Sequence, residues 1–541
     1  MSPHDQTTTD DVPPPDTAIV RDPAPWPYRT GLPGRPGRPA DPPVPRLLVG
    51  AAVAAGLACA AAIPTGRAGV GWAVAAAVVA IAVAVAGWRT PGRVRALHPW
   101  WVRAETLAWA AAAVALPVVA AVRSAQWLAA LCLLTALAAG ALAVAGRQMR
   151  SVLRAVLALP IAALRAVPWL GRAARGTGRA GAVAAGGFRL AASLLVGLVL
   201  VALFGSLLAS ADPVFAQLVD VALPTFDADV LAERVVLFVV GAGAVAGAVL
   251  LLAAPPALAL PRLRPTPLRT RDWAVPVGAL VALFALFVGV QFAALFGNDA
   301  YVLRTTGLTF AEYARSGFWQ LVAVSVLALA VILAGSRWAP AATAGDRLAK
   351  RVLLGGLAGL CLVVVASAVR RMWLYQEAYG ATVLRLLVAV CELWLGLCFV
   401  LVLVAVLRLR PHGTARPMLG TAVAALLALA VLDPERFVAE QNVARFEATG
   451  RLDGEYLSGL SADAVPALLR LPDSTERTCI LGTIARREQA EPDEDWRSAN
   501  VSRAAARAAA GHLAATRADA DRWTVPEPDA PVPTDPGCWR Y

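Results

Sequence analysis

Long apolar stretches recur along this chain of 541 residues and restrict its fold more than any other feature. A helix needs about 20 apolar residues to cross the roughly 30 Å hydrocarbon core of a membrane. Because 58% of the residues are hydrophobic and only 16% are charged, an ordinary soluble protein is excluded. The sequence predicts an all-α, polytopic integral membrane protein with about 11 transmembrane helices. The eleven candidate stretches are Leu47 to Ile63, Ala68 to Trp88, Ala104 to Val122, Ala125 to Gly146, Phe188 to Ser210, Arg234 to Leu260, Trp273 to Phe296, Gly317 to Gly335, Val352 to Val369, Val383 to Leu407 and Pro417 to Leu432.

The basic residues divide the connecting loops into two groups. Loops 89–103, 147–187, 261–271, 336–351 and 408–416 hold 22 Arg and Lys residues, whereas the alternate loops hold six. Because basic loops of membrane proteins remain in the cytoplasm, we expect an N-in/C-out topology. Only one of the 49 basic residues is a lysine. This bias favours a GC-rich coding sequence, and we expect a multi-pass protein of a bacterial plasma membrane.

Two segments outside the spans are expected to lie in the cytoplasm. Residues 1–46 are rich in proline and lack the pattern of a removable signal peptide, so we expect a disordered tail before the first four transmembrane helices, residues 47–146. Residues 147–187 mix apolar residues with arginine and contain no acidic residue. This pattern predicts an amphipathic helix along the inner leaflet, with anionic headgroups as partners. The same helix could serve only as an interface anchor, and the presence of a single aromatic residue, Trp169, disfavours nucleic acid.

The composition changes after residues 188–432, which hold the remaining seven predicted transmembrane helices. Residues 433–523 contain many acidic residues and predict a small helical extracytoplasmic domain, and residues 524–541 form a proline-rich tail. Cys479 and Cys538 both lie in this part. An oxidising exterior predicts a disulfide between them, with two unpaired thiols as the alternative. The predicted helices are Pro434 to Thr449, Asp463 to Leu471, Glu476 to Gln489 and Asp495 to Arg517.

Residues for enzymatic chemistry are sparse. The chain has four histidines, in a tail, two loops and the predicted outer domain, so no zinc cluster or Ser/His/Asp set can be assembled. It also lacks a phosphate-binding glycine loop with its lysine. We therefore expect no catalytic residue, no cofactor and no metal.

Polar side chains within the predicted spans form the first candidate site. Glu392 lies near the middle of its span, and Arg385 lies two turns earlier on nearly the same face. Gln291 and Gln320, on two other spans, could share an interior with them. An ionisable group at this depth is costly unless it has a partner. Glu392 is therefore either a proton or cation relay, or a neutral or paired carboxyl group that holds helices together.

Aromatic and charged residues expected at the outer ends of the spans form the second candidate site. These residue types are typical of the interfacial belt of membrane proteins. They could instead form an extracytoplasmic surface for a ligand or a protein partner. The members are Asp212, Asp299, Tyr301, Tyr313, Arg315, Arg371, Tyr375 and Tyr379.

Several strings of residues resemble a bacterial family of polytopic membrane proteins. The strings are Ser210 to Phe215, Phe310 to Leu321, Arg371 to Tyr375, Ala378 to Arg385, Asn442 to Arg445, Leu452 to Leu457 and Leu460 to Pro466. The family is catalogued as domain of unknown function four-one-seven-three, with its relative four-one-five-three. The resemblance covers Phe188 to Leu471. It implies a multi-span integral protein and transfers no catalytic residue.

Three classes of function follow from these features. The first is a non-enzymatic envelope scaffold or sensor, whose outer helical domain would meet an extracytoplasmic protein partner. The alternative is a secondary transporter or proton-coupled permease that uses Glu392, although few polar residues lie at mid-depth. A lipid-modifying membrane enzyme comes third, because a nucleophile with its base is missing. The sequence leaves the oligomeric state open.

Overall fold

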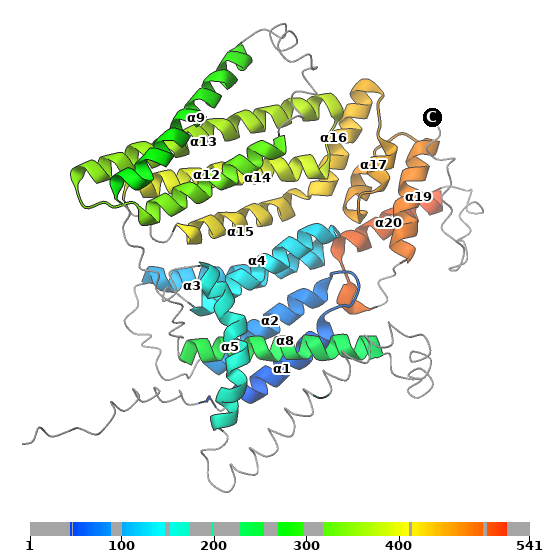
Figure 1. Cartoon of the computed structure of the whole chain (residues 1–541). Coiled ribbons are helices and arrows are strands. Elements are labelled where there is room, and N and C mark those ends of the chain that lie inside the picture. The colour runs from blue at the N-terminus through cyan, green and yellow to red at the C-terminus, as the bar shows by residue number, and fades with distance from the viewer. Residues whose placement is uncertain are drawn as a thin grey trace, which may run out of the picture. The chain divides into compact units, whose positions relative to one another are not determined.

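The structure is a computed structural model that describes residues 44–45, 47–87, 100–145, 152–173, 197, 228–253, 269–296, 318–409, 414–490 and 495–516. Every secondary-structure element in these segments is helical (Figure 1). Ten of the described helices are long and apolar enough to cross a membrane. The predicted all-α fold with many candidate membrane helices is therefore confirmed for the described part of the chain.

Four helices from distant parts of the sequence share one core. Helices α1 (Leu48–Ala62), α2 (Val70–Gly87) and α5 (Val152–Ala173) pack against α8 (Ala228–Ala253). Alanine and valine dominate this core, and Trp169 of α5 is its one large aromatic side chain. Small residues of this kind allow close approach of helices in a membrane.

A second core joins an early hairpin to the last apolar helix. Helices α3 (Trp100–Val122) and α4 (Gln126–Ala145) are connected by a three-residue loop, and α15 (Ala415–Leu432) packs against both. An ion pair of 2.6 Å between Glu105 and Arg416 also links α3 to α15.

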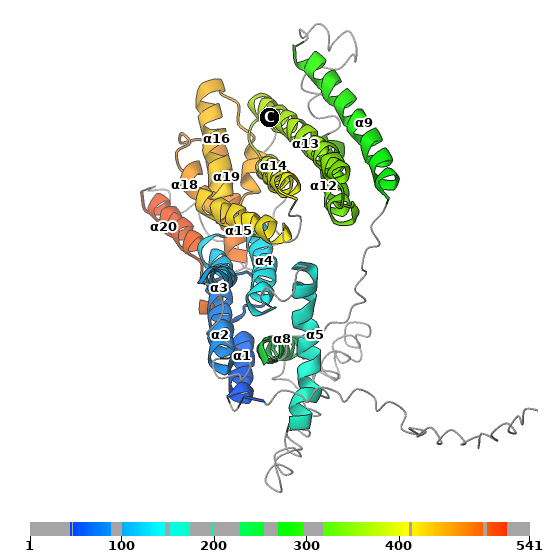
Figure 2. The same cartoon turned by 90° about the vertical axis from the view of Figure 1, so that its left-hand side faces the viewer.

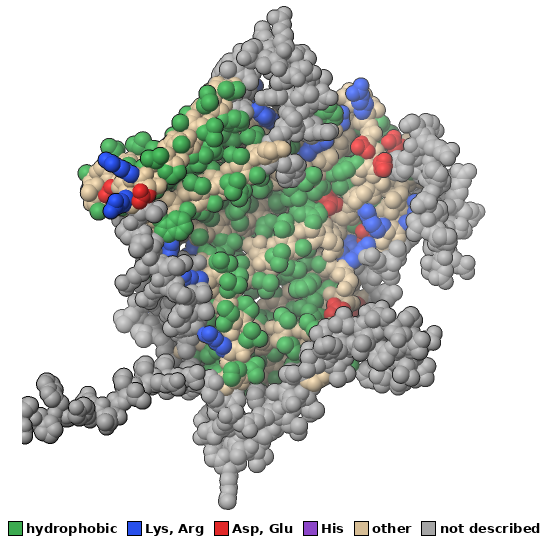
Figure 3. All heavy atoms as spheres, in the orientation of Figure 1, with side chains coloured by type: hydrophobic (Ala, Val, Ile, Leu, Met, Phe, Trp, Pro, Cys, Tyr) green, Lys and Arg blue, Asp and Glu red, His purple; other side chains and the backbone are tan. Residues whose placement is uncertain are grey.

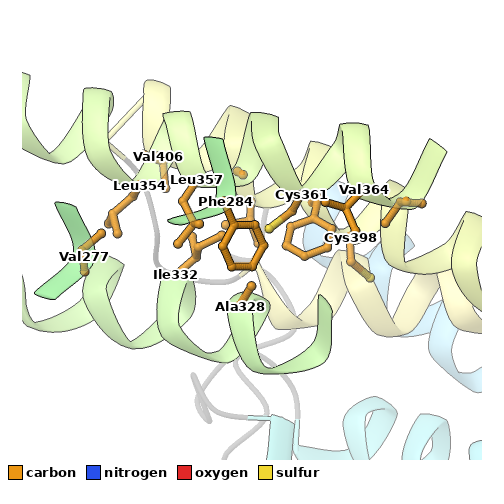
Figure 4. Close-up of a cluster of buried hydrophobic side chains, with 14 of the residues drawn as sticks. Val277, Phe284, Ala328, Ile332, Leu354, Leu357, Cys361, Val364, Cys398 and Val406 are labelled. Atoms are coloured by element: carbon orange, nitrogen blue, oxygen red, sulfur yellow. The ribbon is translucent and has the colours of Figure 1, made fainter. Parts of the chain in front are cut away.

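The third core lies among α9 (Thr270–Phe296), α12 (Phe318–Trp338), α13 (Ala344–Tyr379) and α14 (Val383–Leu407). Phe284 of α9 lies beside Ala328 of α12 and Cys361 of α13 (Figure 4). Helix α14 contributes to two cores, because Phe399 packs in this one and Leu387 packs against the α3–α4–α15 core.

Ten of the eleven predicted spans coincide with described helices. The span Phe188 to Ser210 lies outside the described residues, apart from Gly197. The ten candidate membrane helices of the structure are a slightly different set from those predicted: α1 has only 15 residues, whereas α5, expected to be interfacial, is long and apolar enough to cross.

Helix α13 is much longer than the predicted span Val352 to Val369. It has 36 residues, about 54 Å at the α-helical rise, and therefore exceeds the thickness of the hydrocarbon core. A capping box fixes its start, because Asp346 N–H donates to Thr343 Oγ1 at 3.0 Å and Thr343 N–H donates to the Asp346 carboxylate at 3.0 Å. Hydropathy identifies only the apolar middle of such a helix.

Helix α5 runs across α8 instead of alongside it. In Figure 1 the two helices cross, and in Figure 2, turned by 90°, α8 is seen end-on while α5 still runs vertically. The contact is close, because a Cβ at Gly247 of α8 would lie 2.6 Å from the backbone nitrogen of Ala163 of α5.

The outward faces of the long helices are apolar. Leu134, Leu283, Leu286 and Leu327 are each at least 60% exposed. Hydrophobic side chains cover much of the helical face in Figure 3, and charged side chains gather at helix ends and over the C-terminal part of the chain. A surface of this kind suits contact with lipid chains and not with water.

After α15 the chain forms a set of shorter helices, here called the C-terminal helices. They comprise α16 (Pro434–Thr449), α17 (Gly454–Ser458), the 3-10 helix η2 (Ala462–Ala464), α18 (Val465–Leu468), α19 (Thr475–Ala490), the 3-10 helix η3 (Trp496–Ser498) and α20 (Val501–Thr516). They share a core of their own around Leu457, Leu468 and Ile480. Helix α16 has the predicted bounds, whereas α17 was not predicted.

Candidate functional site

The C-terminal helices hold three loops that connect pairs of long helices. The loops are Ile63–Gly69 between α1 and α2, Arg123–Ala125 between α3 and α4, and Gly380–Thr382 between α13 and α14. We call the set of contacts between these loops and the C-terminal helices the loop–domain junction. All three loops contact the C-terminal helices. The ends of the long helices that these loops connect therefore lie on one side of the molecule.

Asp463 of η2 is the centre of the junction. The backbone N–H groups of Ser124 and Ala125 donate to its carboxylate at 3.0 Å, and its own N–H donates to Ser124 Oγ at 3.1 Å. The Asp463 side chain is 2% exposed. These amides immediately precede α4, so the carboxylate lies at the positive end of the α4 dipole, an arrangement that stabilises by about 0.3–2 kcal/mol.

Glu435 makes a second buried carboxylate contact. Trp127 Nε1 of α4 donates to its Oε1 at 3.0 Å, and the backbone N–H of Ser461 donates to its Oε2 at 2.5 Å. Glu435 therefore links α16, α4 and the residue before η2. Hydrogen bonds to an ionised acceptor are stronger than neutral ones, so both contacts favour a fixed position of α16.

Asp433 is the single residue between α15 and α16. Its φ of 58° is left-handed, a conformation that aspartate tolerates better than most residues. Arg123 Nη1 donates to Asp433 Oδ2 at 2.5 Å, while Arg123 Nε donates to the Ala430 carbonyl at 2.7 Å. Arg123 thus binds both Asp433 and the carboxyl end of α15, where a cation is favoured by the helix dipole.

The Asp433 carboxyl group is buried and only partly satisfied. Its Oδ1 has no hydrogen-bond partner among the described residues. Burial and the nearby Asp463 carboxylate raise the pKa of Asp433 to about 6, although the charges of Arg123 and Arg436 and the backbone N–H of Arg436 favour the ionised form. This carboxyl group therefore titrates close to neutral pH.

The Ile63–Gly69 loop is held by the far end of the C-terminal helices. Val70 N–H donates to the Ala499 carbonyl at 2.9 Å, and Arg67 pairs with Glu488 of α19 at 2.6 Å. A Cβ at Gly69 would lie 2.4 Å from the carbonyl carbon of Ser498, so only glycine permits this approach.

Asn500 and Tyr456 complete the contacts with the other two loops. Asn500 Nδ2 donates to the carbonyls of Ala120 and Arg123 at 2.9 and 2.8 Å. Val383 N–H, at the start of α14, donates to Tyr456 Oη at 2.7 Å. Asn442 Nδ2 of α16 donates to the carbonyl of Ala381 at 2.8 Å. All three loops are thus bonded to the C-terminal helices through buried or half-buried groups.

An open pocket of about 590 Å³ lies beside the junction. Carboxylates and aromatic rings dominate its lining, which consists of Trp127, Val383, Glu435, Asp453, Glu455, Tyr456, Gly459 and Leu460. Among the described residues, no three His, Cys, Asp or Glu side chains are grouped so that they could hold a metal ion.

The buried side chain of Glu392 is the second candidate site. It is 1% exposed, and neither carboxyl oxygen has a hydrogen-bond partner among the described residues. It lies about 14 Å along α14 from its first residue, on the same face as Val388 and Phe399, which pack toward α12 and α13. A buried, unsatisfied carboxyl group at this depth requires a proton, a counter-ion or water.

The other predicted intramembrane residues do not surround Glu392 in the described structure. Arg385 Nη1 donates to the carbonyls of Tyr379 and Gly380, at the end of α13. Gln320 is exposed in the first turn of α12. Gln291 belongs to α9, but its side chain lies outside the described part of the chain.

The predicted outer-face cluster is described only in part. Arg371 and Tyr379 lie in the last turns of α13, and Tyr379 is about half exposed. The side chain of Tyr375 lies outside the described residues, as do Asp212, Asp299, Tyr301, Tyr313 and Arg315. Cys538 lies there too, so the disulfide to Cys479 stays a prediction.

Sequence reasoning missed the junction. Asp433, Glu435 and Asp463 carry it, but each is an ordinary acidic residue in an acidic segment. The Ser461-x-Asp463 pattern is one available signal, because serine and aspartate at that spacing often cap a turn. The partners are more than 300 residues away in the sequence, and no local pattern identifies them.

Comparison with known proteins gives a family but no characterised relative. No curated protein and no solved structure matches the chain. A family model described as Domain of unknown function (DUF4153) matches residues 110–471. The match begins within α3, earlier than the expected start at Phe188. From the sequence we expected family four-one-seven-three, with four-one-five-three only as its relative, whereas the model that matches is that of four-one-five-three. Because the match covers about two thirds of the 541 residues, the chain belongs to the DUF4153 family.

Proposed function

We propose that the chain is a non-enzymatic integral protein of the bacterial plasma membrane that acts as an envelope scaffold or sensor. In this proposal the N-terminus is inside and the C-terminal helices face the exterior. The excess of basic residues in alternate loops, 22 against six, supports that orientation. The three loops held by the C-terminal helices all belong to the group with few basic residues, as the proposal requires.

One observation carries the proposal: the C-terminal helices bind three loops at once. A shift of one pair of long helices against another must break or strain hydrogen bonds at Asp463, Asn500 or Tyr456. Coupling of this kind is reciprocal, so a partner bound to the C-terminal helices would also bias the arrangement of the long helices. A scaffold or sensor needs this connection between an exposed surface and the membrane part.

On the inner side, the proposal assigns α5 to the lipid surface. The helix runs across α8 (Figure 2). The side chains of Leu153, Leu164 and Val167 on α5 are well exposed. Arg154 and Arg165 on the same helix would meet anionic headgroups, while the apolar side chains enter the acyl region. In this arrangement α5 is an interfacial helix and does not span the bilayer.

Crosslinking in intact cells tests the role of the C-terminal helices. A photoreactive amino acid at Glu455, on the rim of the pocket, should capture an envelope protein in the native chain and in Gly66→Ala. Capture should fall in Gly69→Ala, because a methyl group at residue 69 meets the Ser498 backbone, whereas residue 66 has open space. Equal capture in all three chains would contradict the proposed coupling. Failure to capture any protein from several exposed positions would contradict the partner role.

The disulfide between Cys479 and Cys538 belongs to the same proposal. An exterior location of the C-terminal helices would expose both residues to oxidising conditions. Mass spectrometry of protein alkylated without reduction should find the two cysteines in one linked peptide pair. Alkylated Cys538 in freshly purified protein would contradict the bond.

A proton or cation relay through Glu392 is the second candidate function. The complete burial of this side chain without a hydrogen-bond partner among the described residues favours it. In reconstituted vesicles, Glu392→Gln should abolish a proton-coupled flux that native protein and Glu447→Gln, a change on the exposed surface of α16, both retain. A flux that survived Glu392→Gln, or no flux in native protein, would remove the relay.

A further inference from the structure

The junction contains a carboxyl group that serves two roles. Asp433 is the only residue between α15 and α16, so any swing of the C-terminal helices away from the loops must turn about its backbone. Its side chain also bonds to Arg123 in the α3–α4 loop at 2.5 Å. The hinge is thus bonded to one of the loops from which the C-terminal helices would separate.

The contact with Arg123 is one-sided. Only Oδ2 accepts from Arg123, while Oδ1 is buried without a hydrogen-bond partner among the described residues. A proton can therefore bind to Oδ1 while Oδ2 keeps its contact with the guanidinium group. Protonation removes the cost of an ionised, unsatisfied oxygen in a buried place.

The charged groups around Asp433 act in opposite directions. Asp463 of η2 disfavours a second negative charge, whereas Arg123 of the α3–α4 loop and both the side chain and the backbone N–H of Arg436 on α16 favour it. Glu435, the next acidic residue on α16, is bonded to Trp127 and Ser461. Burial and Asp463 outweigh the two arginines, since the pKa of Asp433 in the docked arrangement is about 6.

We propose that Asp433 and Arg123 form an acid-stabilised latch, in which proton uptake by the Asp433 carboxyl group favours the docked arrangement of the C-terminal helices over a released one. The inference deepens the proposed sensor role by naming its signal, the acidity on the side of the membrane that holds the junction. At neutral pH the latch is weaker, and the C-terminal helices separate from the loops more often.

The sign of the effect follows from linkage. In a released arrangement Asp433 meets water, and its pKa returns to the ordinary value of 3.8. The docked arrangement then binds the proton more tightly, so docking strengthens as the pH falls from above 6 toward 4 and loses this contribution as the pH rises through 6. From these two pKa values we expect the docking equilibrium to rise about tenfold between pH 7.5 and pH 5.

Hydrogen exchange on the full chain in lipid nanodiscs tests the latch. The amides of Ser124 and Ala125 donate to Asp463, so their protection reports docking. After correction for the intrinsic rate at each pH, their protection should rise about tenfold from pH 7.5 to pH 5 in the native chain. Asp433→Asn, which carries a neutral side chain at every pH, should give pH-independent protection, and Glu447→Gln should keep the native profile.

Each result decides the inference. Protection in the native chain that is flat or falls on acidification overturns the latch, even if Asp433→Asn does not fold. A rise that persists unchanged in Asp433→Asn also overturns it, because another group must then take up the proton. A flat pH profile in the native chain, together with partner capture that still depends on residue 69, would overturn only the latch. A native profile that rises on acidification and is lost in Asp433→Asn, without capture of any partner, would overturn only the partner role.

Discussion

At Gly69 the α1–α2 loop touches the backbone that precedes α20. A methyl group there would lie 2.4 Å from the Ser498 carbonyl carbon, and backbone atoms cannot move aside as a flexible side chain can. We expect Gly69→Ala to destabilise the docked C-terminal helices by about 1–3 kcal/mol. Limited proteolysis should show faster cleavage at the exposed Arg451 and Arg470, while Gly66→Ala should resemble the native chain. Equal cleavage rates in both variants would show that the loop does not set the docking.

Lys350 is the one lysine of the chain and lies buried near the start of α13. Its Nζ donates to the carbonyls of Ser336 and Ala339 at the end of α12, at 2.6 and 3.3 Å. An amine-reactive reagent should therefore leave Lys350 unmodified in the folded protein and modify it after unfolding in detergent. Rapid modification under native conditions, detected by peptide mass spectrometry, would contradict its burial.

At the residue scale, the position of a residue along a span can be read from the sequence, but the direction of its side chain cannot. Glu392 was selected because it lies mid-span, and the structure places it fully buried. Arg385 and Gln320 were grouped with it on position alone, but the direction of a side chain depends on which neighbours pack against each helix face. Those neighbours are known only from the tertiary structure.

At the scale of elements, α5 depends on a single large side chain. Trp169 is 1% exposed and packs among small residues of α1, α2 and α8. Replacing it with alanine should cost about 3–5 kcal/mol, because the surrounding helices cannot close the space. Leu164→Ala on the outward face of α5 should cost much less, since this side chain is 77% exposed. A thermal unfolding midpoint lowered equally by both changes would contradict this packing of α5.

The sequence predicts the bounds of some helices, but it does not predict which helices pack against one another. The apolar middle of α13 was predicted, but its polar ends at Asp346 and Arg371 lower the hydropathy, although the helix continues through them. The pairing of α8 with α1, α2 and α5 was not predicted, because alanine-rich helices fit many neighbours. Helix α16 was predicted with its bounds, since Pro434 marks its start and Gly450 its end.

At the scale of the whole molecule, the proposed function depends on the side of the membrane on which the C-terminal helices lie. The distribution of basic residues predicts that they are outside, and their contacts with loops Ile63–Gly69, Arg123–Ala125 and Gly380–Thr382 join them to the long helices. The family match covers residues 110–471 and therefore includes two of these three loops together with Asp433 and Asp463.

Protease accessibility in intact cells tests this placement most directly. One epitope tag would follow residue 541 and another would precede residue 1, in the native chain and in Gly69→Ala. We predict that protease added outside removes the C-terminal tag, leaves the N-terminal tag intact and cuts the C-terminal helices faster in Gly69→Ala. A C-terminal tag that is protected until the membrane is permeabilised would contradict the orientation, the disulfide and the exterior sensor together.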